Sequence, residues 1–104
     1  MIRVPDSVSD SMVFAAREKA AKNSDATALN RLELFPYDEG ECLQTLHIGP
    51  YSDEGPVLAD LHSRIMPEAG VTFGRPHHEI YLSDFRRTQP EKLKTILRQP
   101  VVPL

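Results

Sequence analysis

Hydrophobic residues recur at roughly helical spacing in two stretches of the chain. The first, from Asp6 to Asn23, is rich in alanine, glutamate, lysine and arginine, which favour helix. The second runs from Pro56 to Glu68, carries its apolar side chains on one side and is followed by Gly70, a common helix terminator. The pattern therefore predicts one helix over 6–23 and another over 56–68.

Two shorter apolar runs flank a turn between these helices. Residues 32–35 lead into Pro36, and the turn-forming sequence Asp38-Glu39-Gly40 separates them from the apolar-rich run 42–48. Gly49-Pro50 then breaks the second run, because proline cannot donate to a strand ladder. These features predict a β-hairpin made of 32–35 and 42–48.

The segment from His77 to Ser83 alternates between two types of side chain. Successive residues of a strand point to opposite faces of the sheet. One set suits a core beneath the second helix, while the other is polar and aromatic and suits a solvated or ligand-facing surface. The first set is His78, Ile80 and Leu82, and the second is His77, Glu79, Tyr81 and Ser83.

The C-terminal part predicts a helical turn and a final strand. Thr88-Gln89-Pro90-Glu91 matches a capping box at the start of a helical turn. Residues 96–102 predict a strand, and Pro100 within it predicts a position at a sheet edge or near the end of the strand. The order helix, strand, strand, helix, strand, strand indicates an α+β domain in which helices cover one face of a mostly antiparallel sheet.

Length, charge and cysteine content exclude several classes of protein. A chain of 104 residues fits one small domain, and its net charge of −3 without a basic patch argues against nucleic-acid binding. No apolar run approaches the roughly 20 residues that span a bilayer, and no signal-peptide pattern is present. The single Cys42 cannot form an internal disulfide and is interpreted as a small, half-buried hydrophobe, which agrees with a cytoplasmic location.

Two segments are distinctive in content as well as in spacing. The first is Leu46-His47-Ile48-Gly49-Pro50-Tyr51-Ser52-Asp53-Glu54. The second runs from His77-His78-Glu79-Ile80-Tyr81-Leu82-Ser83-Asp84 through Arg86-Arg87-Thr88 and Pro90-Glu91-Lys92-Leu93-Lys94-Thr95-Ile96 to Arg98 and Pro100-Val101. Both closely resemble the GyrI-like small-molecule-binding family. That family includes the effector-binding domains of multidrug-sensing transcription regulators, the DNA gyrase inhibitor protein and stand-alone relatives.

The resemblance implies a fold of two strand-helix-strand-strand modules around a pseudo-twofold axis, with ligands in the cleft between them. This chain resembles only the second module of the stand-alone relatives and the helix that precedes it. We therefore expect residues 1–104 to form a single GyrI-like half-domain, with a tail, helix and connector in 1–30 and a sheet module in 31–104. One module supplies half of the cleft walls and leaves sheet surface exposed, so we expect a homodimer that completes the cleft.

Glu79 is the first candidate for ligand binding. A carboxylate among aromatic and aliphatic neighbours is expensive to bury without compensation, and in the family a glutamate at this point of the strand lies in the ligand cleft. A carboxylate in an aromatic-walled site attracts lipophilic cations, and Tyr81, on the same face, would form one wall. The alternative interpretation is a glutamate on a solvated sheet face.

Four further residues are weaker candidates for the ligand site. Tyr51 and Tyr37 are candidate walls, although an aromatic residue beside a turn is more often a packing lid. Glu54 is a candidate second carboxylate, although a glutamate before a helix often serves the helix dipole. His77 belongs to the ligand-facing set of its strand.

No metal or cofactor is predicted. His77 and His78 are adjacent in a strand and point to opposite faces, while His47 and His62 lie on different elements without the spacing of a metal site. A haem-binding family of SOUL type shares the two-module architecture, but a resemblance of fold transfers no axial ligand.

Three functions agree with these features. The first is a cytosolic binding module for hydrophobic, cationic or polycyclic small molecules, which acts without chemical change. The second is an enzyme, because some stand-alone relatives hydrolyse cyclopropane-containing genotoxins with a cleft glutamate and an aromatic residue. Glu79 would then be the general base, and Tyr81 or Tyr51 would orient the substrate. The third is a partner module for another GyrI-like chain.

Overall fold

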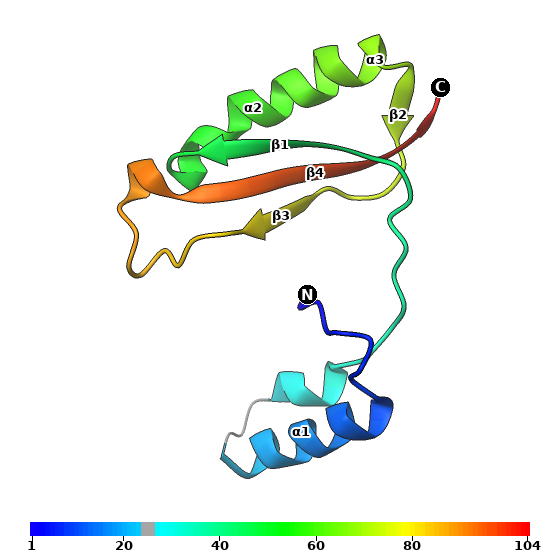
Figure 1. Ribbon diagram of the computed structural model, residues 1–104, viewed down its shortest axis with the longest axis vertical. Coiled ribbons are helices and arrows are strands. Elements are labelled where there is room, and N and C mark those ends of the chain that lie inside the picture. The colour runs from blue at the N-terminus through cyan, green and yellow to red at the C-terminus, as the bar shows by residue number, and fades with distance from the viewer. Residues whose placement is uncertain (24–26) are drawn as a thin grey trace. The chain divides into compact units, whose positions relative to one another are not determined.

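The chain divides into two compact units, Met1–Tyr37 and Asp38–Leu104. The computed structural model describes residues 1–23 and 27–104 (Figure 1). We call the larger unit, which carries the whole sheet, the sheet module. Across the two described ranges, no helix has the length and apolar character needed to cross a membrane.

The N-terminal unit contains a helix and a 3₁₀ turn. Helix α1, Asp10–Asn23, begins after Ser9, whose Oγ accepts a hydrogen bond from the backbone N–H of Met12 at 3.3 Å. A serine in this position satisfies a backbone donor of the first turn, so the helix starts later than the predicted 6–23. The 3₁₀ turn η1, Thr27–Arg31, follows, and neither element contains a buried residue.

The predicted hairpin of 32–35 and 42–48 is wrong. Strand β1, Cys42–Ile48, forms as expected, but it pairs with β4, Lys94–Pro103, and residues 32–40 have no regular structure. Pro36 removes a backbone donor next to the first run, and a two-stranded hairpin alone is only marginally stable. Pairing with the long C-terminal strand provides β1 with backbone hydrogen-bond partners along its whole length.

Strand β4 is the centre of a four-stranded antiparallel sheet. β1 pairs with one edge of β4, while β2, Val71–Phe73, and β3, His78–Tyr81, follow one another along the other edge. Figure 1 shows β1 and β3 on either side of β4. The α+β class with an antiparallel sheet is therefore confirmed, whereas β2 has no counterpart among the predicted elements.

A bulge separates β2 from β3. Residues 74–77 on this side face only residues 99–100 of β4. The carbonyl of Pro100 accepts a hydrogen bond from the N–H of Gly74 at 3.0 Å. The prediction of a sheet edge at Pro100 is wrong, because β4 is the central strand. The missing N–H of Pro100 falls opposite the bulge, where no ladder bond is needed.

The second predicted helix forms over residues 54–68 and contains one wider turn. Its parts are α2, Glu54–Asp60, a π turn, Leu61–Ile65, and α3, Met66–Glu68. The N–H of Met66 donates to the carbonyl of Leu61, five residues back. Pro67 has no N–H for the carbonyl of Ser63 and its ring would crowd that carbonyl in a regular helix, which accounts for the wider turn before it.

This helix packs on one face of the sheet and buries a small core (Figure 1). The buried apolar side chains are Leu61, Met66, Leu93, Leu97 and Val101. Within the sheet module, all of whose residues are described, no helix covers the opposite face. That face presents exposed apolar side chains, among them Leu46 and Ile48.

The alternation predicted for 77–83 is present, but its two faces are the reverse of the prediction. Glu79 and Tyr81 pair with Leu97 and Thr95, whose side chains are buried beneath the helix. Residues directly opposite each other on adjacent strands share a face. Glu79 and Tyr81 therefore point to the face that the helix covers.

The set expected to form the core lies on the helix-free face instead. His78 and Ile80 pair with Arg98 and Ile96, and Leu82 is exposed. Both sets contain rings or aliphatic chains, so the alternation separates them without showing which one the helix meets. The packing of the helix against the buried residues of β4 decides this.

The short helical turn before β4 forms at Pro90–Lys92, η4. Gln89 is its N-cap and makes no side-chain capping bond, so the predicted capping box of Thr88 and Glu91 is wrong. The N–H of Lys92 donates to the carbonyl of Gln89 at 2.9 Å. A turn this short satisfies its own backbone groups and leaves little for a side-chain cap to do.

Candidate functional site

Glu79 and Tyr81 are neighbours on β3, on the face that the helix covers. The hydroxyl of Tyr81 donates a hydrogen bond to Oε2 of Glu79 at 2.8 Å. The ring of Tyr51, from the turn η2, Tyr51–Asp53, meets the Tyr81 ring edge-on with centroids 5.4 Å apart. Three residues selected from the sequence are therefore in contact.

A sharp change of direction after β1 brings the start of the helix to this place. Gly49 has a φ of +140°, a conformation that favours glycine, and Pro50 ends the ladder. The turn η2 and the helix α2 follow directly and carry Tyr51 and Glu54 toward β3. The Gly49-Pro50 break seen in the sequence thus positions the site.

Glu54 lies in the first turn of α2 and is only 4% exposed. Its Oε1 is buried and has no hydrogen-bond partner. The carboxyl group of Glu79 is a neighbouring acidic group. Burial, followed by the neighbouring Glu79, raises the pKa of Glu54 above its ordinary value of 4.5. We call Tyr51, Glu54, Glu79 and Tyr81 the carboxyl cluster.

Two groups beneath the carboxyl cluster oppose the increase in the pKa of Glu54. His47, on β1, is buried and donates from Nε2 to the carbonyl oxygen of Pro50 at 3.0 Å, because a carbonyl can only accept. The hydroxyl of Thr95, on β4, is buried beside Glu54 without a well-aligned hydrogen bond. Both residues lower the pKa of Glu54, but burial and Glu79 act more strongly.

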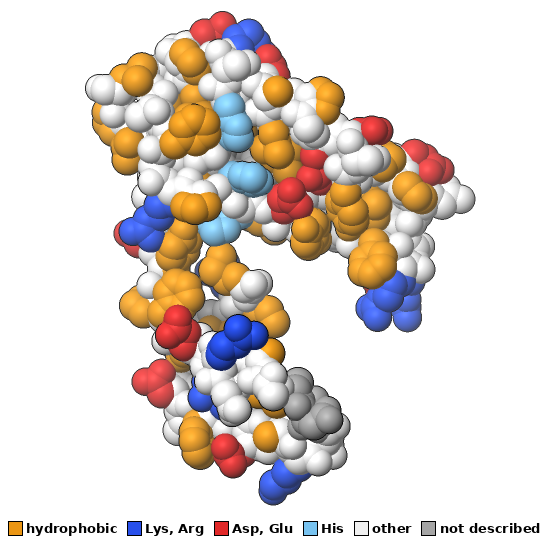
Figure 2. Space-filling model, turned by 180° about the vertical axis from the view of Figure 1, so that it is seen from behind, with side chains coloured by type: hydrophobic (Ala, Val, Ile, Leu, Met, Phe, Trp, Pro, Cys, Tyr) orange, Lys and Arg blue, Asp and Glu red, His pale blue; other side chains and the backbone are white. Residues whose placement is uncertain are grey.

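The outer side of the carboxyl cluster is open. Tyr81 is 60% exposed although its ring contacts Tyr51 and its hydroxyl contacts Glu79. The hydrogen bond to Glu79, followed by burial, raises the pKa of Tyr81 above its ordinary value of 10.0, so the phenol remains a donor at neutral pH. Figure 2 shows acidic side chains beside a row of histidine side chains on the sheet module, with hydrophobic side chains around them.

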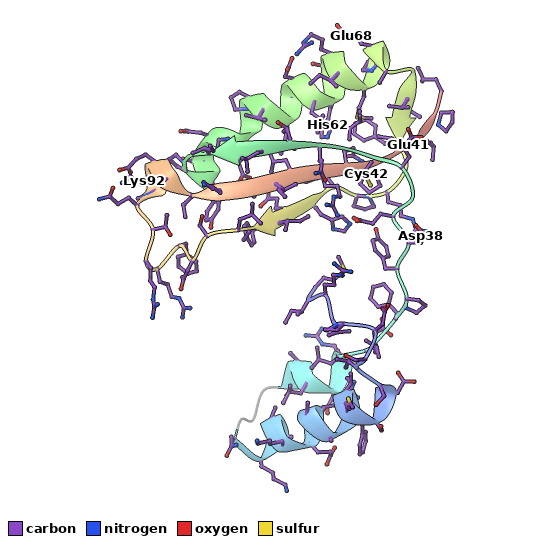
Figure 3. The ribbon with its side chains drawn as sticks, in the orientation of Figure 1. Asp38, Glu41, Cys42, His62, Glu68 and Lys92 are labelled. Atoms are coloured by element: carbon purple, nitrogen blue, oxygen red, sulfur yellow. The ribbon has the colours of Figure 1, made fainter. Side chains whose placement is uncertain are left out.

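A second polar group lies on the same face, beside the bulge. The amide Nε2 of Gln99 donates to the carbonyls of Arg75 and Pro100 at 2.7 and 2.9 Å. Both amide hydrogens are thus used, and Oε1 accepts a hydrogen bond from Nε2 of His62 at 3.2 Å. His62 points from the helix toward the sheet (Figure 3), and its ring packs against Phe73 with centroids 4.9 Å apart. Gln99 is 1% exposed.

The ring of His77 lies with this second group, 6.2 Å from the ring of His62. We call Gln99, His62, Phe73 and His77 the amide cluster. Tyr37 belongs to the N-terminal unit, where its ring packs edge-on against Phe35 with centroids 5.9 Å apart. Of the six candidate ligand residues, the carboxyl cluster brings together Glu54, Glu79, Tyr51 and Tyr81.

The chain is similar to known proteins over nearly its whole length. Residues 5–102 match the family described as the GyrI-like small molecule binding domain. The chain belongs to the GyrI-like family. The resemblance stated from the two distinctive segments is therefore confirmed, and the domain is a small-molecule-binding module.

Three solved structures from Listeria innocua share this GyrI-like fold. One is a hydrolase that is 40% identical, with a TM-score of 0.78 over 96% of this chain and 52% of its own. An uncharacterized conserved protein is 42% identical, with a TM-score of 0.81, and another hydrolase is 40% identical, with a TM-score of 0.80, each over 96% of this chain and 50% of its own. The chain thus spans about half the length of these neighbours. No curated protein matches it.

Sequence reasoning missed His47 and Thr95 in this GyrI-like site and Gln99 in the amide cluster. His47 pairs with Thr95 across β1 and β4, and Thr95 pairs with Tyr81 across β4 and β3. Three strands therefore bring polar side chains together at this place on the face that the helix covers. Polar residues at alternate strand positions were the available signal, but the register that aligns them is not readable from one sequence.

The carboxyl cluster has the chemistry of an acid pair beside two phenol rings. A carboxylate with aromatic walls attracts organic cations. A pair of carboxyl groups in different environments also separates into a proton donor and a proton acceptor. In the part of the chain that the structure describes, no group of three histidine, cysteine, aspartate or glutamate side chains is placed to hold a metal ion.

Proposed function

We propose that the carboxyl cluster is the ligand site of this GyrI-like domain and that it binds a hydrophobic small molecule with a positive charge. The observation that carries the proposal is the buried Oε1 of Glu54, which has no partner and lies beside the carboxyl group of Glu79. An unsatisfied buried polar group costs about 1–3 kcal/mol. Native proteins keep few such groups, and perturbed carboxyl groups concentrate at functional sites.

The tyrosine rings supply the other part of recognition. Tyr51 and Tyr81 stand edge to face and are both exposed, so their free faces are open to a ligand. A cation over a tyrosine ring gains about 0.5–2 kcal/mol, and the charge of Glu79 adds to this attraction. A neutral polycyclic compound gains the ring contacts alone, so the site favours the cation.

Calorimetric titration with tetraphenylphosphonium tests this site, with triphenylphosphine oxide as its neutral counterpart. We expect the cation to bind about tenfold more tightly, which corresponds to about 1.4 kcal/mol. Glu79→Gln keeps the shape but removes the charge, so it should abolish the difference. Glu68→Gln is the matched control, since it makes the same change at an exposed glutamate outside the carboxyl cluster, at the end of the helix. Equal affinities in the unmodified protein contradict the cation preference, and no binding contradicts the site.

We also propose that a second copy of the chain completes the site. β3 pairs with β4 alone within the sheet module. The N–H of Leu82 donates to the carbonyl of Lys94, so the alternation of the ladder turns the backbone N–H groups of Glu79 and Tyr81 away from β4. An open edge of this kind readily pairs with another strand. A twofold axis perpendicular to the sheet would keep both helices on one face and set two carboxyl clusters across the seam.

Size-exclusion chromatography with light scattering tests this pairing. We expect a particle of about twice the chain mass of 11.7 kDa at micromolar concentration. A monomer under these conditions contradicts the homodimer. A stable complex that forms only with another GyrI-like chain from the native cell supports the partner-module function instead.

We expect the domain to work in the cytosol, where its cysteine stays reduced. Cys42 is a free, half-buried thiol at the start of β1 (Figure 3), and it lies 3.6 Å from the carbonyl of Gly40. Burial, more than the neighbouring Glu39, raises the pKa of the Cys42 thiol, which disfavours the reactive thiolate. Localisation of a tagged chain in the native cell tests this setting.

Hydrolysis is the second candidate function, because two of the solved neighbours are hydrolases. In this proposal Glu79 acts as the general base that takes a proton from water, while the rings of Tyr51 and Tyr81 hold a cyclopropane-containing genotoxin. The attacked ring carbon forms a C–O bond, the strained C–C bond breaks with its electron pair on the departing carbon, and that carbon takes up the proton that Glu79 removed from water.

Incubation with such a genotoxin separates the two functions. Formation of the ring-opened alcohol supports hydrolysis, provided that Glu79→Gln abolishes turnover and Glu68→Gln does not. Turnover that survives Glu79→Gln excludes Glu79 as the base. Binding without turnover leaves the binding module as the function.

A further inference from the structure

We propose that the Glu54–Glu79 pair holds one proton in the free protein and releases it when an organic cation binds, so that ligand binding is coupled to proton release. This rests on the proposed cation site and adds its regulation by pH. The observation behind it is a juxtaposition. A buried carboxyl group with one unpartnered oxygen, Glu54, lies beside a second carboxyl group, Glu79, whose Oε2 accepts the Tyr81 hydroxyl at 2.8 Å on the open side of the cluster.

Two adjacent carboxyl groups cannot both ionise without strong repulsion. A shared proton replaces this repulsion with a hydrogen bond. Glu54 is the member that holds the proton, because it is 4% exposed and its ionised form would lose most of its hydration. Glu79 accepts a hydrogen bond from the hydroxyl of Tyr81, which stabilises a negative charge on Glu79. The upward direction of the Glu54 pKa agrees with this assignment.

The groups that face Glu54 from the neighbouring elements are compatible with one shared proton. They are Glu79 and Tyr81 from β3, His47 from β1, Thr95 from β4 and Tyr51 from η2. The phenol of Tyr81 stays protonated at neutral pH, because its pKa is raised. His47 and Thr95 moderate the increase in the pKa of Glu54 without cancelling it. The repulsion that the proton removes is therefore that between the two carboxyl groups.

A bound cation changes this balance. Its charge, placed beside Glu79 and the rings of Tyr51 and Tyr81, stabilises a second negative charge on Glu54. The O–H bond of Glu54 breaks, its electron pair stays on the carboxylate, and the proton passes to the solvent. The charge of the ligand replaces that of the proton, so the site keeps the same net charge. A neutral ligand provides no such replacement.

Calorimetry in buffers of different ionisation enthalpy measures the released proton directly. Tetraphenylphosphonium is a suitable probe, since it is a permanent cation with no proton of its own. We expect the release of up to one proton per bound cation. Over the pH range in which the pair titrates, the affinity should increase by up to about tenfold per pH unit. Triphenylphosphine oxide should release no proton and show no such slope.

Two variants of the same type separate this coupling from other titrations. Glu54→Gln keeps the size and a hydrogen-bond donor, so it should bind the cation without proton release and with a flat pH profile. Glu68→Gln should behave like the unmodified protein. Binding without release in the unmodified protein overturns the coupling alone. Failure of the cation to bind overturns the proposed function as well.

Carbon-13 titration of the carboxyl groups tests the pair without any ligand. We expect Glu54 to titrate above the ordinary glutamate range, and Glu79→Gln should move that titration downward, because it removes the neighbouring negative charge. A Glu54 that titrates at the ordinary value in the free protein overturns the shared proton, whatever the ligand does.

Discussion

Gln99 and Glu54 are two of the four buried polar side chains of the sheet module, and their environments are opposite. In the amide cluster, Gln99 uses both amide hydrogens and its oxygen, and each partner lies within 3.2 Å. In the carboxyl cluster, Glu54 leaves one oxygen without a partner and has a group of like charge beside it. Burial is nearly complete at both positions. The cost of burial is thus compensated at Gln99 and left uncompensated at Glu54.

In the function we propose, this difference separates a polar group that stabilises the fold from one that binds a ligand. Gln99 bridges the bulge between β2 and β3 and ties it to the helix through His62. Glu54 lies next to the open β3 edge, where a ligand can reach its neighbour Glu79. Loss of the amide should therefore reduce stability, whereas loss of the carboxylate should change binding and its pH dependence.

Gln99→Leu should have the largest effect on stability. It removes the donor to the carbonyls of Arg75 and Pro100 and the acceptor of the His62 ring N–H, at a cost of about 3 kcal/mol. Urea unfolding followed by circular dichroism measures the loss. Gln44→Leu is the control, since Gln44 is exposed on the helix-free face, and it should change stability by less than about 0.5 kcal/mol. Equal losses in both variants contradict the special role of Gln99.

Gly74→Ala should have the next largest effect, because it acts on the same bulge. An added Cβ would lie 3.2 Å from the backbone carbon of Val101 and 3.3 Å from the carbonyl oxygen of Pro100. The backbone must shift, at a cost of about 1–2 kcal/mol. Gly55→Ala meets no atom within 4 Å and should leave stability unchanged or raise it by up to about 1 kcal/mol. The same unfolding series compares both variants, and a harmless Gly74→Ala shows that the bulge is not tightly held.

Glu54→Gln should have a smaller effect that depends on pH. The pKa of Glu54 is raised in the folded state, so its contribution to stability is complete below the unfolded value and is lost as the pH rises through the folded value. The variant has no carboxyl group at this position, so its stability does not decrease with pH for this reason. Its stability relative to the unmodified protein should therefore increase from about pH 4 to pH 8. Thermal unfolding across that range measures the difference, and a constant difference contradicts the raised pKa.

Tyr81→Phe should have the smallest effect on stability, less than about 0.5 kcal/mol, because the side chain is 60% exposed. It removes the hydrogen bond to Glu79 and one of the three tyrosines in the chain. In an ultraviolet titration, the variant should lose a phenol that ionises above the ordinary value of 10.0. Glu79→Gln should instead shift that phenol downward. No change in either variant contradicts the Tyr81–Glu79 bond.

Much of the fold could be predicted from local patterns. The helix over 54–68 and the strands β1 and β3 formed where spacing and break residues indicated. The errors arose where distant segments compete. β1 pairs with the C-terminal strand and not with residues 32–35, and Pro100 lies in a central strand because a bulge faces it. Both outcomes depend on how β4 pairs with distant segments.

The candidate site was predicted in part. Glu79, Tyr81, Tyr51 and Glu54 were selected from the sequence, and the structure brings them together. Their role in binding stays a prediction. The face was assigned wrongly, because an alternating strand with rings and aliphatic chains in both sets does not reveal which set a helix will cover.

By itself, the sequence determined the α+β class, the second helix, the division of β3 into two side-chain sets and the membership of the GyrI-like family. These follow from local spacing and from distinctive segments. Only the tertiary structure decided that β4 is central, that Glu79 faces the helix and that Glu54 is buried beside it. Those features depend on the register and packing of residues far apart in the chain, which the free energy of the whole fold selects.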